Sequence, residues 1–149
     1  MEYFAHSQKE FIYKYVVMLT DVDQFKHMSF ANYLKLMFLA SDALFSGFST
    51  PEFMTGKRLR LRDIKMQFKW QTVAGDNILI KINASQEMKS QIILLHTFVN
   101  EGTAALVGLG KQIFEIQDTT SSVPTDVPDD IRKLLMPIWV DEEHLLYHY

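Results

Sequence analysis

Two aspartates and a histidine lie close together near the start of the chain, in the segment TDVDQFKHMSFANY. Asp21 and Asp23 are separated by one residue, and His27 follows four residues after Asp23. A carboxylate can attack a carbonyl carbon directly or deprotonate a water molecule that does so. For Asp23 we favour such a catalytic role over an Asx turn or a helix cap. Asp21 is expected to hold the loop or contact a partner subunit, and His27 to orient Asp23, protonate a leaving group or bond to the backbone.

An apolar run that follows these residues begins with a candidate helix start. Ser29 is a good N-cap residue, and its hydroxyl could accept a hydrogen bond from an amide near Asn32. If the helix starts there, the backbone amides of Phe30 and its neighbours point back toward the loop with unpaired N–H groups and a partial positive charge. Such donors polarise a carbonyl and hold the oxyanion formed when it is attacked. Asp23 and this helix start predict an acyl-transfer site that needs neither a metal nor a cofactor.

Other kinds of site have less support in the sequence. Asp21, Asp23 and His27 could be imagined as metal ligands, but no further cluster of ligands would complete the site. The chain has no cysteine, which excludes disulfides, thiolate zinc sites and cysteine nucleophiles. No serine stands in a G-x-S-x-G motif, which disfavours a serine hydrolase. His96 lies in the apolar run IILLHTFV and is expected to be a core histidine.

Cationic residues crowd one later segment of the chain. Arg58, Arg60, Arg62 and Lys65 could meet the phosphate groups of a ligand. They alternate with apolar residues, however, and are more simply explained as the solvated face of a strand. The net charge of -3 gives no electrostatic reason to expect a nucleic-acid partner.

The elements that must position the loop are one strand, one long helix and four further strands. Residues 11–18 are rich in aromatic and β-branched side chains and are predicted to form a strand. Residues 30–48 form a predicted helix that is apolar around nearly its whole circumference, apart from a polar stripe at Lys35, Asp42 and Ser46. Further strands are predicted over residues 59–70, 77–84, 90–100 and 104–116, and a short helix over 129–135.

Glycines punctuate the strand region. The VAGD segment is a turn signal, and NEG at 100–102 predicts a hairpin turn. Gly108 and Gly110 lie inside the last strand and indicate a bulge or the close approach of another backbone.

A helix that is apolar nearly all round needs another element to wrap it. A strongly curved antiparallel sheet is the economical solution, and this predicts an α+β protein with the hot-dog fold. The 149 residues suit a single domain spanning 1–149, with residues 137–149 as an unassigned C-terminal tail that contains His144 and His148. No signal-peptide pattern and no uninterrupted apolar span are present, so we expect a cytoplasmic protein with no membrane partner.

The segment from Asp21 to Tyr33 resembles the D-x-D-x-x-G-H-V-N-N-x-x-Y signature of hot-dog acyl-CoA thioesterases of the 4-hydroxybenzoyl-CoA thioesterase type. The resemblance extends over roughly residues 10 to 135, and includes Gly75-Asp76 before a strand and the glycines of the last strand. Lys26 departs from the usual glycine, and Ser29-Phe30 departs from the common Asn-Asn pair.

The resemblance implies hydrolysis of an acyl-CoA or acyl-carrier-protein thioester, with coenzyme A present only as part of the substrate. It assigns Asp23 as nucleophile or general base, the Phe30 backbone amide as the group that polarises the carbonyl, and His27 as an assistant. Candidate substrate-binding residues are Phe25, Met28, Ser29, Phe30 and Tyr33. The resemblance also implies a homo-oligomer, a dimer or tetramer with the acyl pocket at the subunit interface. The alternatives are a non-catalytic acyl-thioester-binding module and, less favoured, a hydratase of the same fold.

Overall fold

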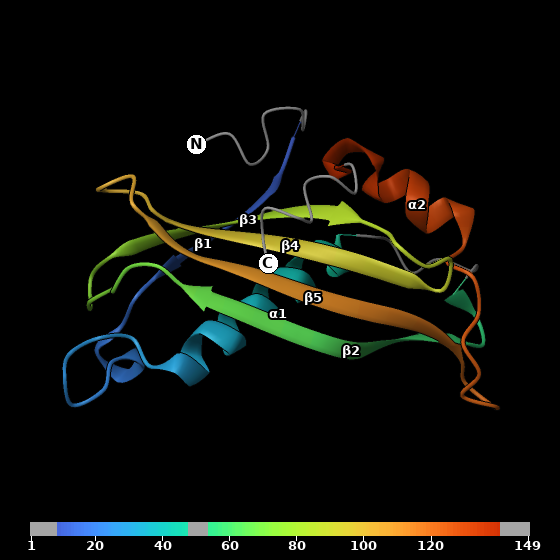
Figure 1. Ribbon diagram of the computed structural model, residues 1–149, viewed down its shortest axis with the longest axis horizontal. Coiled ribbons are helices and arrows are strands. Elements are labelled where there is room, and N and C mark those ends of the chain that lie inside the picture. Colours follow the sequence, from blue (N-terminus) through green and yellow to red (C-terminus); the bar gives the residue numbers. More distant parts are fainter. Residues whose placement is uncertain (1–8, 48–53, 141–149) are drawn as a thin grey trace.

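A five-stranded antiparallel sheet and one long helix form most of the structure (Figure 1). In this computed structural model we describe residues 9–47 and 54–140. The strands lie in the order β1-β3-β4-β5-β2. Their bounds are β1 (Phe11–Val16), β2 (Lys57–Phe68), β3 (Asn77–Ser85), β4 (Gln91–Asn100) and β5 (Leu106–Asp118). The two longer helices are α1 (Phe30–Ser46) and α2 (Asp129–Leu135). Every strand and both helices were predicted from the sequence.

The helix α1 packs against one face of the sheet, which curves around it (Figure 1). Its inward residues share one main core with alternate residues of the strands. The buried residues of α1 are Tyr33, Leu36, Met37, Ala40, Ser41 and Leu44. The curved sheet around a buried helix is the arrangement predicted from the helix's apolar circumference.

The polar stripe predicted on α1 lies on its solvent side. Lys35, Asp42 and Ser46 are all exposed, and Phe38 lies on the same stripe with 41% of its surface exposed. The helix ends at Gly47, whose amide donates to the carbonyl of Leu44. Residue 48, the last of the predicted helix, lies outside the described residues. None of the helices described has both the length and the apolar character needed to cross a membrane.

The glycines of β5 allow a close approach, as predicted. A β-carbon on Gly108 would lie 2.8 Å from the carbonyl oxygen of Gln67 and 2.4 Å from Cε of Met66. The register between β4 and β5 also shifts at Phe98/Val99, next to Gly108, so a bulge is present as well.

The predicted turn after Asn100 is present, and Glu101 donates its amide to the carbonyl of Asn77.

The C-terminal part of the described chain completes the edge of the sheet. After α2, a short 3-10 helix (Met136–Ile138) leads to Trp139 and Val140, which lie beside Ala84 of β3. These residues begin the tail that the sequence left unassigned, whereas 141–149, with His144 and His148, lie outside the described residues.

Candidate functional site

The loop between β1 and α1 folds back on itself as a tight hairpin. Val22 and Met28 form an antiparallel bridge, and the amide of Asp23 donates to the carbonyl of His27 at 2.9 Å. On the helix side, the amide of Ser29 donates to the carbonyl of Asp21 at 3.2 Å. The structure therefore places Asp23 beside His27, and Asp21 beside the residue that precedes α1.

The carboxylate of Asp23 is held by one of its two oxygens. Its Oδ1 accepts hydrogen bonds from the amide of Phe25 at 2.8 Å and from the amide of His27 at 3.4 Å. This arrangement is an Asx turn, which was the structural alternative to a catalytic role for Asp23. It uses only Oδ1 of the carboxylate. Among the described residues, no group donates to Oδ2, and the side chain is exposed. One oxygen thus fixes the orientation of the carboxylate and the other is accessible.

The start of α1 offers unpaired amide donors. Ser29 occupies the N-cap position with extended backbone angles, as predicted, but its hydroxyl makes no capping hydrogen bond. The amide of Asn32 instead donates to the backbone carbonyl of Ser29 at 3.1 Å. The amides of Phe30 and Ala31 donate to no acceptor within the described residues, so they remain available to a carbonyl oxygen.

Asp21 holds the loop and the helix start together. Its carboxylate Oδ2 accepts from the Tyr15 hydroxyl at 2.5 Å and from the amide of Met18 at 2.8 Å. Its backbone carbonyl accepts from Nδ2 of Asn32 at 2.6 Å. Asp21 is buried and holds the loop through these contacts, which is one of the two roles expected for it from the sequence. Its partners Tyr15 and Asn32 were not predicted.

The hydrogen bond to Asp21 changes the acidity of Tyr15. Together with partial burial and the nearby negative charge, it raises the pKa of the Tyr15 hydroxyl from 10.0 to about 12. Burial likewise raises the pKa of Tyr33, although its hydrogen bond with Thr72 opposes the change. Both phenols are therefore neutral donors or acceptors at physiological pH.

Lys26 adopts a backbone conformation suited to glycine. Its φ is 65°, in the left-handed region, and its amide donates to the carbonyl of Asp23 at 2.9 Å. The signature that this segment resembles has glycine at this position, which suits a left-handed backbone angle, and here a lysine adopts it. The side chain is exposed, so its ammonium is available beside the loop.

An open pocket of about 500 Å³ lies beside the hairpin and the start of α1. The loop and helix contribute His27, Met28 and Tyr33, and the end of β2 with the following segment contributes the rest of the lining: Phe68, Lys69, Trp70 and Gln71. The amide of Met28 donates to the carbonyl of Thr72, which ties the two sides of the pocket together. Asp23 and Phe30 are not among the lining residues, although Phe30 contacts the pocket residue Phe68 with ring centroids 5.2 Å apart.

The predicted substrate-binding residues differ in their exposure. Tyr33 and Met28 are buried and form part of the pocket wall, and Ser29 is half-buried at the N-cap. Phe25 and Phe30 are 69% and 60% exposed. Sequence reasoning missed the opposite wall, formed by Phe68 and Trp70 with Thr72 behind it, because a single sequence does not show which strand end meets the helix start.

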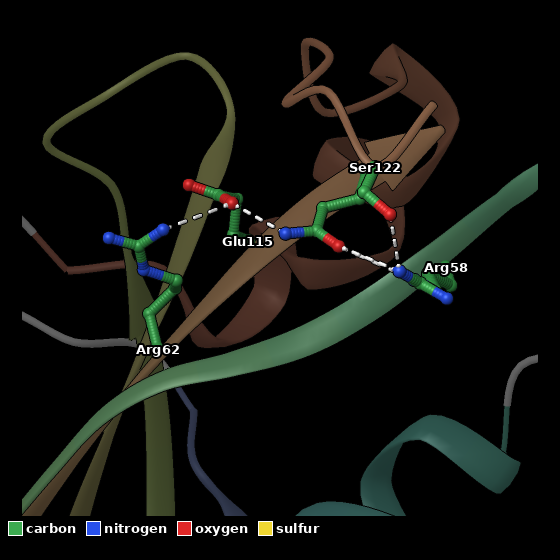
Figure 2. Close-up of polar contacts among 5 residues, drawn as sticks. Arg58, Arg62, Glu115 and Ser122 are labelled. Carbon is green, nitrogen blue, oxygen red and sulfur yellow. Dashed lines mark hydrogen bonds and ion pairs between the residues drawn. The ribbon is translucent and has the colours of Figure 1, made fainter. Parts of the chain in front are cut away.

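The basic segment of β2 faces outward. Arg58, Arg60, Arg62 and Lys65 are exposed, as predicted for a solvated strand face. Figure 2 shows how two of them are anchored: Arg62 pairs with the buried Glu115 at 3.5 Å, and Arg58 donates to Ser122. The Gln117 amide connects them by donating to Glu115 and accepting from Arg58. These contacts give the two arginines a role in the structure of the sheet.

His96 is a core residue, as predicted. It is fully buried within β4, and its Nε2 lies 2.7 Å from Oε1 of Gln112 on the neighbouring strand β5. Within the described residues there is no group of three or more histidine, cysteine or acidic side chains that could hold a metal ion.

Comparison with known proteins identifies a family that this geometry fits. The model of the thioesterase-like superfamily matches residues 17–135. No curated protein matches the chain by sequence.

Several solved structures share the fold. They include a 1,4-dihydroxy-2-naphthoyl-CoA thioesterase from Synechocystis, with 16% identity, a TM-score of 0.76, and coverage of 85% of this chain and 95% of that chain. Protein SAV2348 from Staphylococcus aureus, solved in complex with CoA, has 16% identity, a TM-score of 0.76 and coverage of 93% of each chain. The 12:0-ACP thioesterase from Umbellularia californica has 14% identity, a TM-score of 0.77, and coverage of 89% of this chain and 51% of that chain. The likeness confirms the hot-dog fold.

Replacing Lys26 with glycine should stabilise the protein. A side chain in the left-handed region costs about 1–2 kcal/mol, part of which is offset by the greater freedom of glycine in the unfolded chain. We expect Lys26→Gly to raise the free energy of unfolding by roughly 0.5–1 kcal/mol in urea titrations. Lys26→Ala is the matched control, because it removes the charge and keeps the β-carbon. An equal gain for both variants would contradict the backbone explanation.

The Tyr15–Asp21 hydrogen bond should make stability depend on alkaline pH. Because the folded-state pKa of Tyr15 is about 12 and the unfolded value is near 10, the contribution is complete below pH 10 and is lost as pH rises toward 12. Tyr15→Phe should lower the free energy of unfolding at neutral pH by about 1–2 kcal/mol. This deficit should shrink between pH 10 and 12, and Tyr13→Phe serves as control. A deficit that stays constant with pH would contradict the assignment.

Proposed function

The chain belongs to the thioesterase-like superfamily, and we therefore propose that it hydrolyses an acyl-CoA or acyl-carrier-protein thioester to a free acid and a thiol. The observation that supports the proposal is the hairpin: it carries the Asp23 carboxylate with one oxygen accessible, it leads directly into α1 where the Phe30 amide is unpaired, and an open pocket lies alongside it. An acyl-transfer site needs a carboxylate that attacks or activates water and a donor for the oxyanion.

In the proposed mechanism, the thioester carbonyl oxygen accepts from the Phe30 amide at the start of α1. The positive end of the helix stabilises the negative charge that develops on this oxygen. The role uses only the main chain, so it is compatible with a phenylalanine where relatives carry polar residues. The exposed Phe30 ring is then free to pack against Phe68 and the substrate.

Asp23 acts through its accessible oxygen in either of two routes. As a nucleophile, it forms a bond to the carbonyl carbon, the C–S bond breaks, and water then hydrolyses the resulting anhydride. As a general base, it takes a proton from water as the water oxygen bonds to the carbonyl carbon. The tetrahedral intermediate then collapses, the C–S bond breaks, and the proton passes from Asp23 to the departing thiolate. The amides of Phe25 and His27 on Oδ1 hold the carboxylate in place for both routes. His27 assists by fixing the other side of the hairpin and by lining the pocket.

The carrier of the acyl group is proposed from the neighbours and the surface. One structural neighbour holds CoA, and another is described as an acyl-ACP thioesterase. Either carrier would present the thioester at the end of a flexible arm, which suits an open pocket. Lys69 in the pocket wall and Lys26 on the hairpin are cations placed to meet the phosphates of such an arm.

Replacing Asp23 with asparagine should remove the activity while preserving the hairpin. Asparagine retains an oxygen that can accept from the Phe25 amide, but it neither attacks nor takes a proton. We expect the rate of thiol release from acyl-CoA thioesters to fall by roughly a hundredfold or more. Asp42→Asn, on the exposed stripe of α1, is the matched control. Equal rates for wild type and Asp23→Asn would overturn the assigned role, and binding of an acyl-CoA without turnover in the wild type would indicate the acyl-binding module instead.

We also propose that the protein works as a homo-oligomer. Four large aromatic side chains are exposed around the pocket and the hairpin: Phe25, Phe30, Phe68 and Trp70. The strand β2 is an edge strand of the sheet, and its outer side pairs with no strand among the described residues. An exposed edge next to exposed aromatic side chains favours association with a second copy.

The mass in solution tests the oligomer. Each chain has a mass of 17.4 kDa, so light scattering at micromolar concentration should give about two or four times this value. Trp70→Asp should shift the mass toward a single chain because it places a charge within the aromatic group. A wild type that remains at the mass of one chain would contradict the proposal.

A further inference from the structure

A pair of glycines leaves a gap in the side chains that face α1. Gly108 is in register with Phe98 of β4 and Phe68 of β2, and Gly110 is in register with His96 and Met66. In both cases a glycine lies between two large residues on the helix-facing side of the sheet. The surface of β5 under α1 is therefore lower between these large side chains. We call this depression, with Gly108 and Gly110 as its floor, the trough.

The ends of two methionine side chains fill this trough. A β-carbon on Gly108 would lie 2.4 Å from Cε of Met66, and one on Gly110 would lie 2.4 Å from Sδ of Met37. Met66 comes from β2 and Met37 comes from α1, which crosses behind the sheet in Figure 1. Methionine is unbranched and has three rotatable bonds, so its end can move aside more readily than a branched or aromatic side chain.

The trough adjoins the pocket. Phe68 and Tyr33 line the pocket, and Phe68 lies directly across from Gly108. The ring of Tyr33 contacts Phe68 and Phe98 on either side of Gly108, with centroid distances of 5.1 and 5.9 Å. The end of Met66 lies over Gly108, next to these rings.

A polar residue closes the other end of the trough. Gln112 is the next helix-facing residue of β5 after Gly110 and is fully buried. Its Oε1 bonds to His96, while its Nε2 has no partner among the described residues. An apolar chain is not stabilised by contact with an unpaired amide. From Gly108 to Gly110 the strand rises about 7 Å, which sets the length that the trough adds to the pocket.

We propose that the acyl group is a linear aliphatic chain that turns the half-exposed Phe68 ring aside, passes from the pocket over Gly108 and Gly110 and displaces the ends of Met66 and Met37. The two methionines then determine how long a chain the protein accepts. The proposal rests on the proposed thioester hydrolysis for the nature of the ligand. When the acyl chain displaces a methionine end, the neighbouring residues lose contacts with a flexible thioether and gain contacts with methylene groups of similar size. The glycines beneath carry no side chain that would obstruct this exchange.

The test is binding of S-alkyl-CoA thioethers, which lack the carbonyl and cannot be hydrolysed. Calorimetry with butyl-CoA and dodecyl-CoA gives the ratio of the two affinities for each variant. Met66→Ala empties part of the trough and should raise the dodecyl-to-butyl ratio roughly tenfold. Gly110→Ala places a β-carbon in the trough and should lower the ratio by roughly fivefold or more. Met66→Leu keeps the volume and should give a smaller change than Met66→Ala, and Met88→Ala, at an exposed methionine, is the distant control.

Met66→Ala and Gly110→Ala are expected to change the dodecyl-to-butyl affinity ratio in opposite directions, which a general loss of stability would not produce. Thermal unfolding of each variant identifies any that does not fold, and the remaining variant then decides. A ratio unchanged in Met66→Ala or Gly110→Ala overturns the inference. If the ratios shift as expected but no acyl-CoA is hydrolysed, the chain-binding inference holds and the proposed hydrolysis fails. If hydrolysis occurs and the ratios do not shift, only the inference fails.

Discussion

The burial of α1 is the constraint on which the rest of the structure depends. Its apolar surface extends around most of its circumference, so a flat surface could not cover it, and the sheet curves around it instead (Figure 1). Glycine lets the neighbouring elements approach β5 closely: a β-carbon on Gly108 would lie 2.8 Å from the carbonyl oxygen of Gln67 in β2, and one on Gly110 would lie 2.4 Å from Sδ of Met37 in α1. The same packing fixes where α1 begins, and thereby where its free amides point.

The candidate site lies at the start of this helix and on the hairpin that precedes it. Asp21 connects them by accepting hydrogen bonds from β1, from the following turn and from Asn32 in the helix. With its geometry set by Asp21, the hairpin presents Asp23 at its exposed side, one oxygen fixed and one accessible. Lys26 adopts a positive φ in this turn, so the hairpin forms without the glycine of the family signature.

Much of this was predictable from the sequence because the decisive features are local. The helix start, the turn containing Asp23 and the helix cap position at Ser29 all follow from neighbouring residues. The Ser29 hydroxyl does not cap the helix because the backbone carbonyl of the same residue already takes the Asn32 amide. The pocket wall at Phe68 and Trp70 was not predicted, since it depends on which strand end meets the helix in space. The same holds for the bond between Tyr15 and Asp21.

In the proposed mechanism, the thioester carbonyl binds between the Phe30 amide and Asp23. A structure of the protein with an unreactive ketone analogue of an acyl-CoA, in which a methylene group replaces the sulfur, would show where this carbonyl binds. We expect the ketone oxygen at about 3 Å from the Phe30 nitrogen, with an Asp23 oxygen facing the carbonyl carbon. A ketone oxygen bound elsewhere, with the Phe30 amide and Asp23 both free of the ligand, would contradict it.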